Sequence, residues 1–267
     1  MSSPECADAA LTPLLGRTDL PPGEEWGAFL MQQNLAMASG DFDAVRTLLE
    51  RAEGPAQLGV PYLWVIDAIA GAPFADSAAA QDRWLRTTFG EHYEELRAPV
   101  ALWVASIWNA EVGDTAQLKH ARDALAEVAR DADDPLWRRR GRLFEAGAEA
   151  DLARLRGDTA LALEAFTNLI PSVRSANWDW GLADPLPVER LRYARLLLET
   201  GQYEEAIDVA SVFDSPAATI FPPFVPASLA IRYAAARAAR LTREERQFRE
   251  RLERLGRLDL IGEPPAP

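Results

Sequence analysis

Few residues in the chain have the types and spacing that catalysis or metal binding requires. The two histidines, His92 and His120, each lack a second histidine three or four residues away, which excludes the common zinc spacings. The single cysteine, Cys6, excludes an internal disulfide and a thiolate metal cluster. No serine stands in a G-x-S-x-G elbow, and no glycine-rich phosphate loop occurs. A glycosidase-like pair among the many carboxylates stays open, but the sequence favours a non-enzyme without metal or cofactor.

Aromatic residues offer a second kind of chemistry, because tryptophan is common at binding hot spots. Trp178 and Trp180 lie in Ser-Ala-Asn-Trp-Asp-Trp-Gly, outside the helical pattern, and point the same way if this segment is extended. They form either an aromatic contact surface or, as the favoured alternative, a hydrophobic plug over an open helix pair. Five further tryptophans lie within helical sequence and are expected in the core: Trp64, Trp84, Trp103, Trp108 and Trp137.

The charge of the chain restricts the class of partner. The net charge of −13 argues against a surface that follows a nucleic-acid backbone. Residues 232–258 run against this trend, with nine arginines and four glutamates. The favoured interpretation is a solvated helix with intrahelical ion pairs, and the alternative is a helix that docks on an acidic surface. No apolar run reaches the roughly 18 residues of a membrane span, so we expect a cytoplasmic protein without a membrane partner.

The elements that must position these residues are helices that recur along the chain. Four segments share an alanine-rich helix, a glycine-containing turn and a second amphipathic helix, and no segment has the alternation of a strand. The turn glycines stand at intervals of 73, 44 and 44 residues: Gly40, Gly113, Gly157 and Gly201. A degenerate unit around Gly71 would fill the long interval, and a sixth unit would turn near Leu241 without a glycine.

The residues around each turn indicate how two helices meet there. Glycine at the end of the first helix can adopt a left-handed conformation without steric strain. An aspartate after the glycine can cap the second helix by accepting a backbone N–H, as expected for Asp41, Asp114 and Asp158. Small residues seven before and five after the glycine allow close packing, and Phe166 is expected to fill the space between layers. The small residues are Ala150, Ala194, Ala162 and Ala206.

Two of these turns resemble those of tetratricopeptide (TPR) repeats, in which a Gly-Asp-Tyr turn is followed three residues later by alanine. They are Gly201-Gln202-Tyr203-Glu204-Glu205-Ala206 and Gly40-Asp41-Phe42-Asp43-Ala44. The resemblance implies an all-α fold, a right-handed superhelical solenoid of about five to six antiparallel helical hairpins with a concave binding surface. The 44-residue interval is longer than the family's usual unit, which indicates divergent repeats.

The same resemblance sets the expected domain organisation. Residues 24–258 would form the TPR-like repeat domain, after an irregular lead-in at 1–23 and before a disordered tail at 259–267. The C-terminal third is also similar to the helical-repeat tails of bacterial regulatory proteins, such as serine/threonine kinases and large transcription activators. Such a tail would be the sensory or docking part of a longer protein.

Groove-facing residues follow from the resemblance, because the family places them on the first helix of each hairpin. Counting back six and three residues from the turn glycines gives Asn34, Met37, Asp151, Arg154 and Arg195. Only Asn34 fits the family's clamp for chaperone C-termini, so a chaperone adaptor is not expected. Arg154 and Arg195 could hold a carboxylate or an acidic peptide through paired N–H donors. The favoured alternative is that they are surface arginines paired with local glutamates.

The sequence therefore predicts a scaffold or adaptor that binds another protein or a peptide segment without catalysis. The alternative is a sensory or regulatory domain that binds a small ligand and signals to an effector. An enclosed pocket between helices would favour the alternative, whereas an open trough would favour the scaffold. The oligomeric state stays open.

Overall fold

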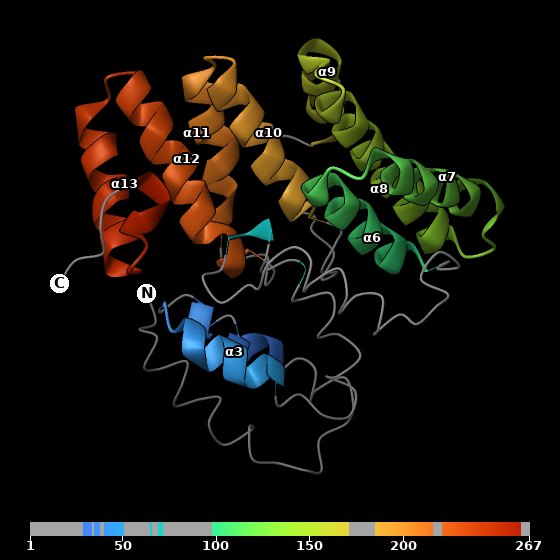
Figure 1. The fold of residues 1–267 in the computed structure, drawn as a ribbon, viewed down its shortest axis with the longest axis horizontal. Coiled ribbons are helices and arrows are strands. Elements are labelled where there is room, and N and C mark those ends of the chain that lie inside the picture. Colours follow the sequence, from blue (N-terminus) through green and yellow to red (C-terminus); the bar gives the residue numbers. More distant parts are fainter. Residues whose placement is uncertain are drawn as a thin grey trace. The chain divides into compact units, whose positions relative to one another are not determined.

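The computed structural model describes residues 29–33, 35–37, 40–50, 65, 69–71, 98–170, 185–215 and 221–262. Throughout these residues the secondary structure consists of α-helices and short 3-10 helices, with no strand (Figure 1). This confirms the all-α class. The lead-in at 1–23 and the residues Asn34, Trp178 and Trp180 lie outside the described residues, as do Trp64 and Trp84.

The chain divides into two compact units. The central unit comprises residues 76–212, and the terminal unit combines residues 1–75 with residues 213–267. The chain therefore crosses between the units twice, after Ala75 and after Val212, and the second boundary separates α11 from the helices that follow it. Each unit is described by itself below.

In residues 98–170 and 185–212, the described part of the central unit, the helices form three hairpins. Within each hairpin the two helices pack against each other, and α8 also packs against α6 and α7. In chain order the helices are α6 (Pro99–Val112), α7 (Thr115–Asp131), α8 (Pro135–Leu155), α9 (Thr159–Leu169), α10 (Pro187–Glu199) and α11 (Tyr203–Ser211). The first helices of the hairpins are therefore α6, α8 and α10, and they carry the candidate site.

The terminal unit contains a further hairpin, in which α12 packs against α13 and the 3-10 helix η4 packs against both. Its elements are α3 (Phe42–Glu50), the end of η2 (Val212–Asp214), η3 (Pro222–Phe224), α12 (Val225–Ala238), α13 (Thr242–Arg254) and η4 (Leu258–Ile261). The helix η4 occupies the start of the segment that the sequence assigned to a disordered tail, because Leu258 is buried there.

The turns between paired helices have the predicted local chemistry. Gly113 and Gly157 lie in the left-handed region, with φ of 75° and 77°. The carboxylates after them cap the second helices: Asp114 accepts from the Gln117 backbone N–H at 3.0 Å, and Asp158 accepts from that of Leu161 at 3.1 Å. The turn of the α12–α13 hairpin, predicted without glycine, uses Arg240 instead, with φ of 61°.

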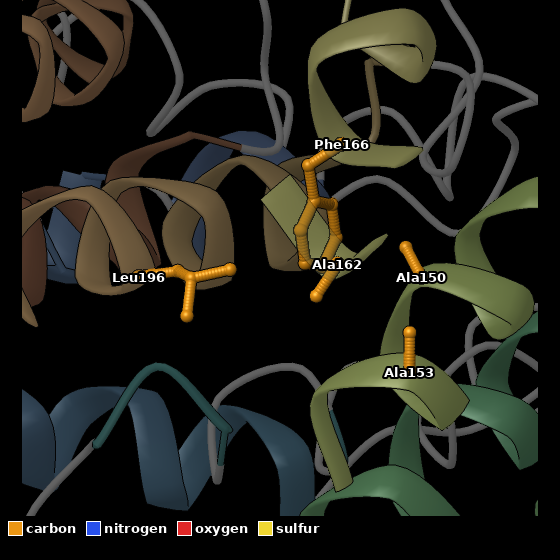
Figure 2. Packing of buried hydrophobic residues seen from close by; sticks show 5 residues of the cluster. All are labelled: Ala150, Ala153, Ala162, Phe166 and Leu196. Carbon is orange, nitrogen blue, oxygen red and sulfur yellow. The ribbon is translucent and has the colours of Figure 1, made fainter. Parts of the chain in front are cut away.

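The packing of alanines between hairpins is also as predicted. Ala150 and Ala153 on α8 meet Ala162 and Phe166 on α9 and Leu196 on α10 in one buried cluster (Figure 2). Small side chains at the first three positions let the helices approach, and the Phe166 ring fills the space between them. This cluster joins the second hairpin of the central unit to the third.

The tryptophans in the described residues only partly follow the prediction. Trp103 and Trp108 are buried on α6, as expected for core residues. The expectation was wrong for Trp137, whose side chain is 39% exposed. Trp137 lies in the first turn of α8, just beyond the point where α7 ends at Asp131, so its ring is not covered by the helix pair. No helix in the described part of the chain is long and apolar enough to cross a membrane.

Candidate binding site on helices α6, α8 and α10

A buried ion pair between α8 and α10 forms the centre of the site. Asp151 and Arg192 are both buried, and the Arg192 guanidinium donates to Oδ2 of Asp151. Arg192 also reaches α6, where its Nη2 donates to the Ile107 carbonyl oxygen at 2.8 Å and to Oε2 of Glu111 at 3.0 Å. One arginine side chain thus ties the first helices of three consecutive hairpins together.

Electrostatics keep this central arginine charged despite its burial. Burial alone would lower the pKa of Arg192, but Asp151 and Glu111 outweigh that effect and raise it above the ordinary value. A buried charge is tolerable when it is paired and its N–H groups are bonded, and both conditions hold here. Replacing Asp151 would leave buried Arg192 with only the partly exposed Glu111, and replacing Arg192 would leave buried Asp151 with only the partly exposed Arg154.

Arg154 lies beside this pair on α8. Its Nε donates to Oδ1 of Asp151 at 3.1 Å, and its Nη2 donates to the Ala110 carbonyl oxygen on α6 at 3.4 Å. Both carboxylate oxygens of Asp151 are therefore occupied by arginines. The Arg154 side chain is still 30% exposed, so it remains partly accessible to solvent.

Arg195 differs from the other two arginines in having no close partner. It is half-buried on α10, three residues after Arg192, and makes no hydrogen bond or ion pair with any residue that the structure describes. Overall, the pKa of its guanidinium is lowered, mainly by burial. The positive charges of Arg192 and Arg154 lower it further, whereas the carboxylates of Glu111 and Glu199 oppose the shift. Arg195 therefore lies close enough to two other arginines to be repelled by them.

We call Glu111, Asp151, Arg154, Arg192 and Arg195 the arginine network. It contains three arginines and two carboxylates, and both carboxylates are engaged with Arg192. One positive charge in the network is thus left without a carboxylate of its own, and Arg195 carries it. A half-buried guanidinium with free N–H groups is well suited to bind a carboxylate or another planar anion, because its donors match two acceptor oxygens at once.

A second buried acid, Glu189, lies at the start of α10 next to the network. Its side chain is 1% exposed, and its Oε1 accepts from the Trp103 indole N–H on α6 at 2.7 Å. Oε2 has no hydrogen-bond partner within the described parts of the chain. Burial raises the pKa of Glu189 to about 7, although the Trp103 hydrogen bond opposes the shift. Gly147 on α8 leaves room for this carboxyl, since a Cβ there would lie 3.0 Å from Oε1.

The structure brings together three of the residues that the sequence assigned to a partner-binding groove. Asp151 and Arg154 share one ion-paired cluster, and Arg195 lies near it. Asp151 is 1% exposed, so its role here is to hold Arg154 and Arg192 in place. Met37 belongs to the terminal unit and is also 1% exposed. The remaining assignments, Asn34, Trp178 and Trp180, lie outside the described residues.

Sequence reasoning missed Arg192 and Glu111, because they do not occupy the two positions that were transferred from the resemblance. One signal could have revealed Arg192. An aspartate in the apolar segment around Asp151 needs a cation when the helix is buried, and Arg192 precedes Arg195 by three residues on the same helix face. Glu189 offers no comparable signal, because its neighbours in the sequence are ordinary for a helix start.

Other features of the described residues bear on cofactors and relatives. No group of three or more histidine, cysteine, aspartate or glutamate side chains in these residues is arranged to hold a metal ion. Comparisons of the chain with protein-family models, with curated proteins and with solved structures give no match.

Proposed function

We propose that the chain is a non-catalytic binding module with a TPR-like arrangement of hairpins, and that the arginine network binds an acidic segment of another protein. The observation that carries the proposal is Arg195, a half-buried guanidinium without a partner in the described residues. In a TPR-like solenoid the first helices of successive hairpins line the concave face, and α6, α8 and α10 occupy that place in the hairpin order.

The network is organised to present cations rather than to perform acid–base chemistry. Both oxygens of Asp151 are occupied by arginines, which removes it as a proton acceptor. Burial raises the pKa of Glu189 to about 7, in the range of a general base, but its side chain is 1% exposed and bonded to the Trp103 indole. A binding role uses Arg154 and Arg195 as they stand, because both are partly exposed and their guanidinium N–H groups can donate to a carboxylate.

The ligand gains more from this site than from an ordinary surface arginine. Arg192 and Asp151 fix the neighbouring helices, so less conformational freedom is lost on binding. A charge-assisted hydrogen bond to a partly desolvated guanidinium contributes about 1.5–3 kcal/mol, which corresponds to about 10- to 150-fold in affinity. A fully solvated ion pair contributes about 0–1 kcal/mol, so the two cases are distinguishable by mutation.

A small carboxylate is the second candidate ligand, as expected for a sensory domain. The two arginines that would bind an acidic side chain could equally bind such a molecule. Two cavities lined by described residues, one at the α7–α8 corner and one between α8 and α9, are open to solvent, and neither includes the arginine network. Neither of these two cavities therefore supplies an enclosed small-ligand site at the network.

The proposal is tested with a pooled peptide library in which the termini are blocked and the content of Asp and Glu varies. The best binder is titrated against the wild type, Arg195→Gln and Arg154→Gln, with Arg142→Gln as a matched control. Arg142 is an exposed arginine on α8 outside the network, so the control loses the same charge. We expect acidic peptides to be enriched, and their affinity to fall about tenfold or more in the first two variants only.

Three results would contradict or redirect the proposal. Equal losses in Arg195→Gln and Arg142→Gln would mean that only general charge matters. Enrichment of peptides without regard to acidity would remove the network from recognition. Displacement of the peptide by simple dicarboxylates at low concentration would move the assignment to the small-ligand sensor.

A further inference from the structure

A second surface, at the corner where α7 meets α8, has a chemistry opposite to that of the arginine network. It surrounds a cavity of about 580 Å³ with an apolar floor formed by Val128, Ala132 and Trp137. Trp137 and its neighbour Leu136 are 39% and 40% exposed, which places them among the five exposed large apolar residues in the described part of the chain. Exposed tryptophan at the edge of a cavity is typical of a contact surface.

The rim of this cavity is acidic. Its described lining contains Glu127, Asp131, Asp133 and Asp134 and no lysine or arginine. Asp131 is paired with Arg130 at 2.9 Å, and Asp134 caps the Leu136 backbone N–H at 2.8 Å. Glu127 and Asp133 have no ion pair within the described parts of the chain. We call this apolar floor with its acidic rim the corner pocket.

The chain itself carries a surface that complements the corner pocket. On α13, Arg243, Arg246 and Arg254 are exposed and make no ion pair with any described residue. Their spacing of three and eight residues places them on one side of the helix. By contrast, Arg251 is bound to Asp214 at 2.6 Å, and Arg249 pairs with Glu253 at 3.6 Å. We call the three unpaired residues the arginine row.

We propose that the corner pocket binds the arginine row of a second copy of the chain. A guanidinium placed over the Trp137 ring gains a cation–π contact, while Glu127 and Asp133 supply the carboxylates that the arginine row lacks. The apolar stems of the arginines then cover the floor of the pocket. This contact uses neither Arg154 nor Arg195, so it is independent of the proposed binding function.

The overall charge of −13 opposes association but does not prevent this contact. At physiological ionic strength, charges separated by more than about 8 Å are largely screened, whereas ion pairs in contact persist. Because the net charge still opposes association, we expect the contact to be weak. Because higher salt also screens the ion pairs in contact, we expect association to disappear there. Because the two surfaces differ, the contact is heterologous: each copy can bind one neighbour through its pocket and another through its row, so more than two copies can associate.

Mixing two half-competent variants tests this arrangement. The first, Asp133→Arg with Trp137→Ala, loses the pocket and keeps the row; the second, Arg243→Glu with Arg246→Glu, loses the row and keeps the pocket. All four residues are exposed, so the folded state should be preserved. In sedimentation velocity at low salt, wild type should show a mass that rises with concentration. Each variant alone should stay monomeric, and their equimolar mixture should form a 1:1 heterodimer and nothing larger.

The control is the double variant Arg142→Glu with Arg156→Glu, which makes the same charge change at two other exposed arginines. It should associate as the wild type does. The proposal is overturned if wild type remains monomeric at every concentration at low salt, or if the two half-competent variants fail to form a heterodimer. Loss of association in the control would also overturn it, because net charge rather than the arginine row would then be responsible.

Discussion

The buried carboxyl of Glu189 should make the stability of the central unit depend on pH, in the direction opposite to that of an ordinary salt-bridged acid. Glu189 is surrounded by Trp103 on α6, Gly147 and Asp151 on α8, and Arg192 on its own helix. Burial penalises its charged form, Asp151 adds to that effect, and the Arg192 charge is already engaged by two other carboxylates. Between pH 4.5 and about 7, the folded state therefore keeps a proton on the Glu189 carboxyl that the unfolded chain has released.

The size of this effect follows from the two pKa values. The pKa of Glu189 is raised from 4.5 to about 7, a difference that corresponds to about 3 kcal/mol. Below pH 4.5 both states are protonated and Glu189 contributes no pH dependence. As the pH rises towards about 7, only the unfolded state loses its proton, so the free energy of unfolding falls by about 3 kcal/mol and then stays constant.

Glu189→Gln isolates this contribution. Glutamine keeps the oxygen that accepts from the Trp103 indole and cannot ionise. Urea unfolding, followed by circular dichroism at about pH 5 and about pH 8, should show that the variant is more stable than wild type at the higher pH by about 2–3 kcal/mol. At the lower pH the two proteins should be nearly equal. Hydrogen exchange in peptides from α6 and α10 locates the difference in the central unit.

An identical pH dependence in wild type and Glu189→Gln would refute this reasoning, because it would assign the proton uptake to other groups. A wild type that is more stable than the variant at about pH 8 would refute it as well. That result would mean that the ionised carboxylate is stabilised in the fold, contrary to the geometry around it.

Three further predictions concern the backbone and the ion pairs. Arg240→Gly should stabilise the α12–α13 hairpin by about 1 kcal/mol, because glycine removes the left-handed strain at φ of 61°. Gly157→Ala, at φ of 77°, should destabilise the α8–α9 hairpin by a similar amount. Thermal unfolding measures both effects. Asp214→Asn should destabilise the terminal unit by about 2 kcal/mol near pH 7, since Asp214 binds buried Arg232 at 2.7 Å. Burial alone would raise the pKa of Asp214, but its bonds to Arg251 and Arg232 lower it overall, so the difference from wild type should shrink as the pH falls through that lowered pKa. Gly141→Ala should cost about 1–3 kcal/mol in urea unfolding despite the better helix propensity of alanine, because its Cβ would lie 2.6 Å from the Ala129 backbone nitrogen.

The sequence predicted the hairpins well because their signals are local. A glycine in the left-handed region, a capping aspartate and alanines at fixed distances all act within about one turn of the residue that carries them. The turns at Gly113 and Gly157 and the cluster around Phe166 therefore lie where the pattern indicated. The turn at Arg240 was also predicted, because the helical spacing of apolar residues continues on both sides of it although no glycine is present.

The candidate site was predicted only in part, because its contacts join residues far apart in the chain. Arg192 meets Asp151 and Glu111 across 41 and 81 positions, and such pairs depend on how the hairpins stack rather than on local pattern. The burial of Asp151 and Glu189 has the same origin. Trp137 was placed in the core because it lies in helical sequence, but its exposure depends on where the preceding helix ends.

The most direct test of the proposed function is a double-mutant cycle between Arg195 and one acidic residue of the best-binding peptide. Affinities are measured for wild type and Arg195→Gln, each with the acidic peptide and with its Glu-to-Gln or Asp-to-Asn counterpart. A guanidinium that binds the carboxylate directly predicts a coupling energy of about 1.5–3 kcal/mol for at least one acidic position. A coupling energy near zero at every acidic position would contradict the assignment of Arg195 as the anion-binding residue.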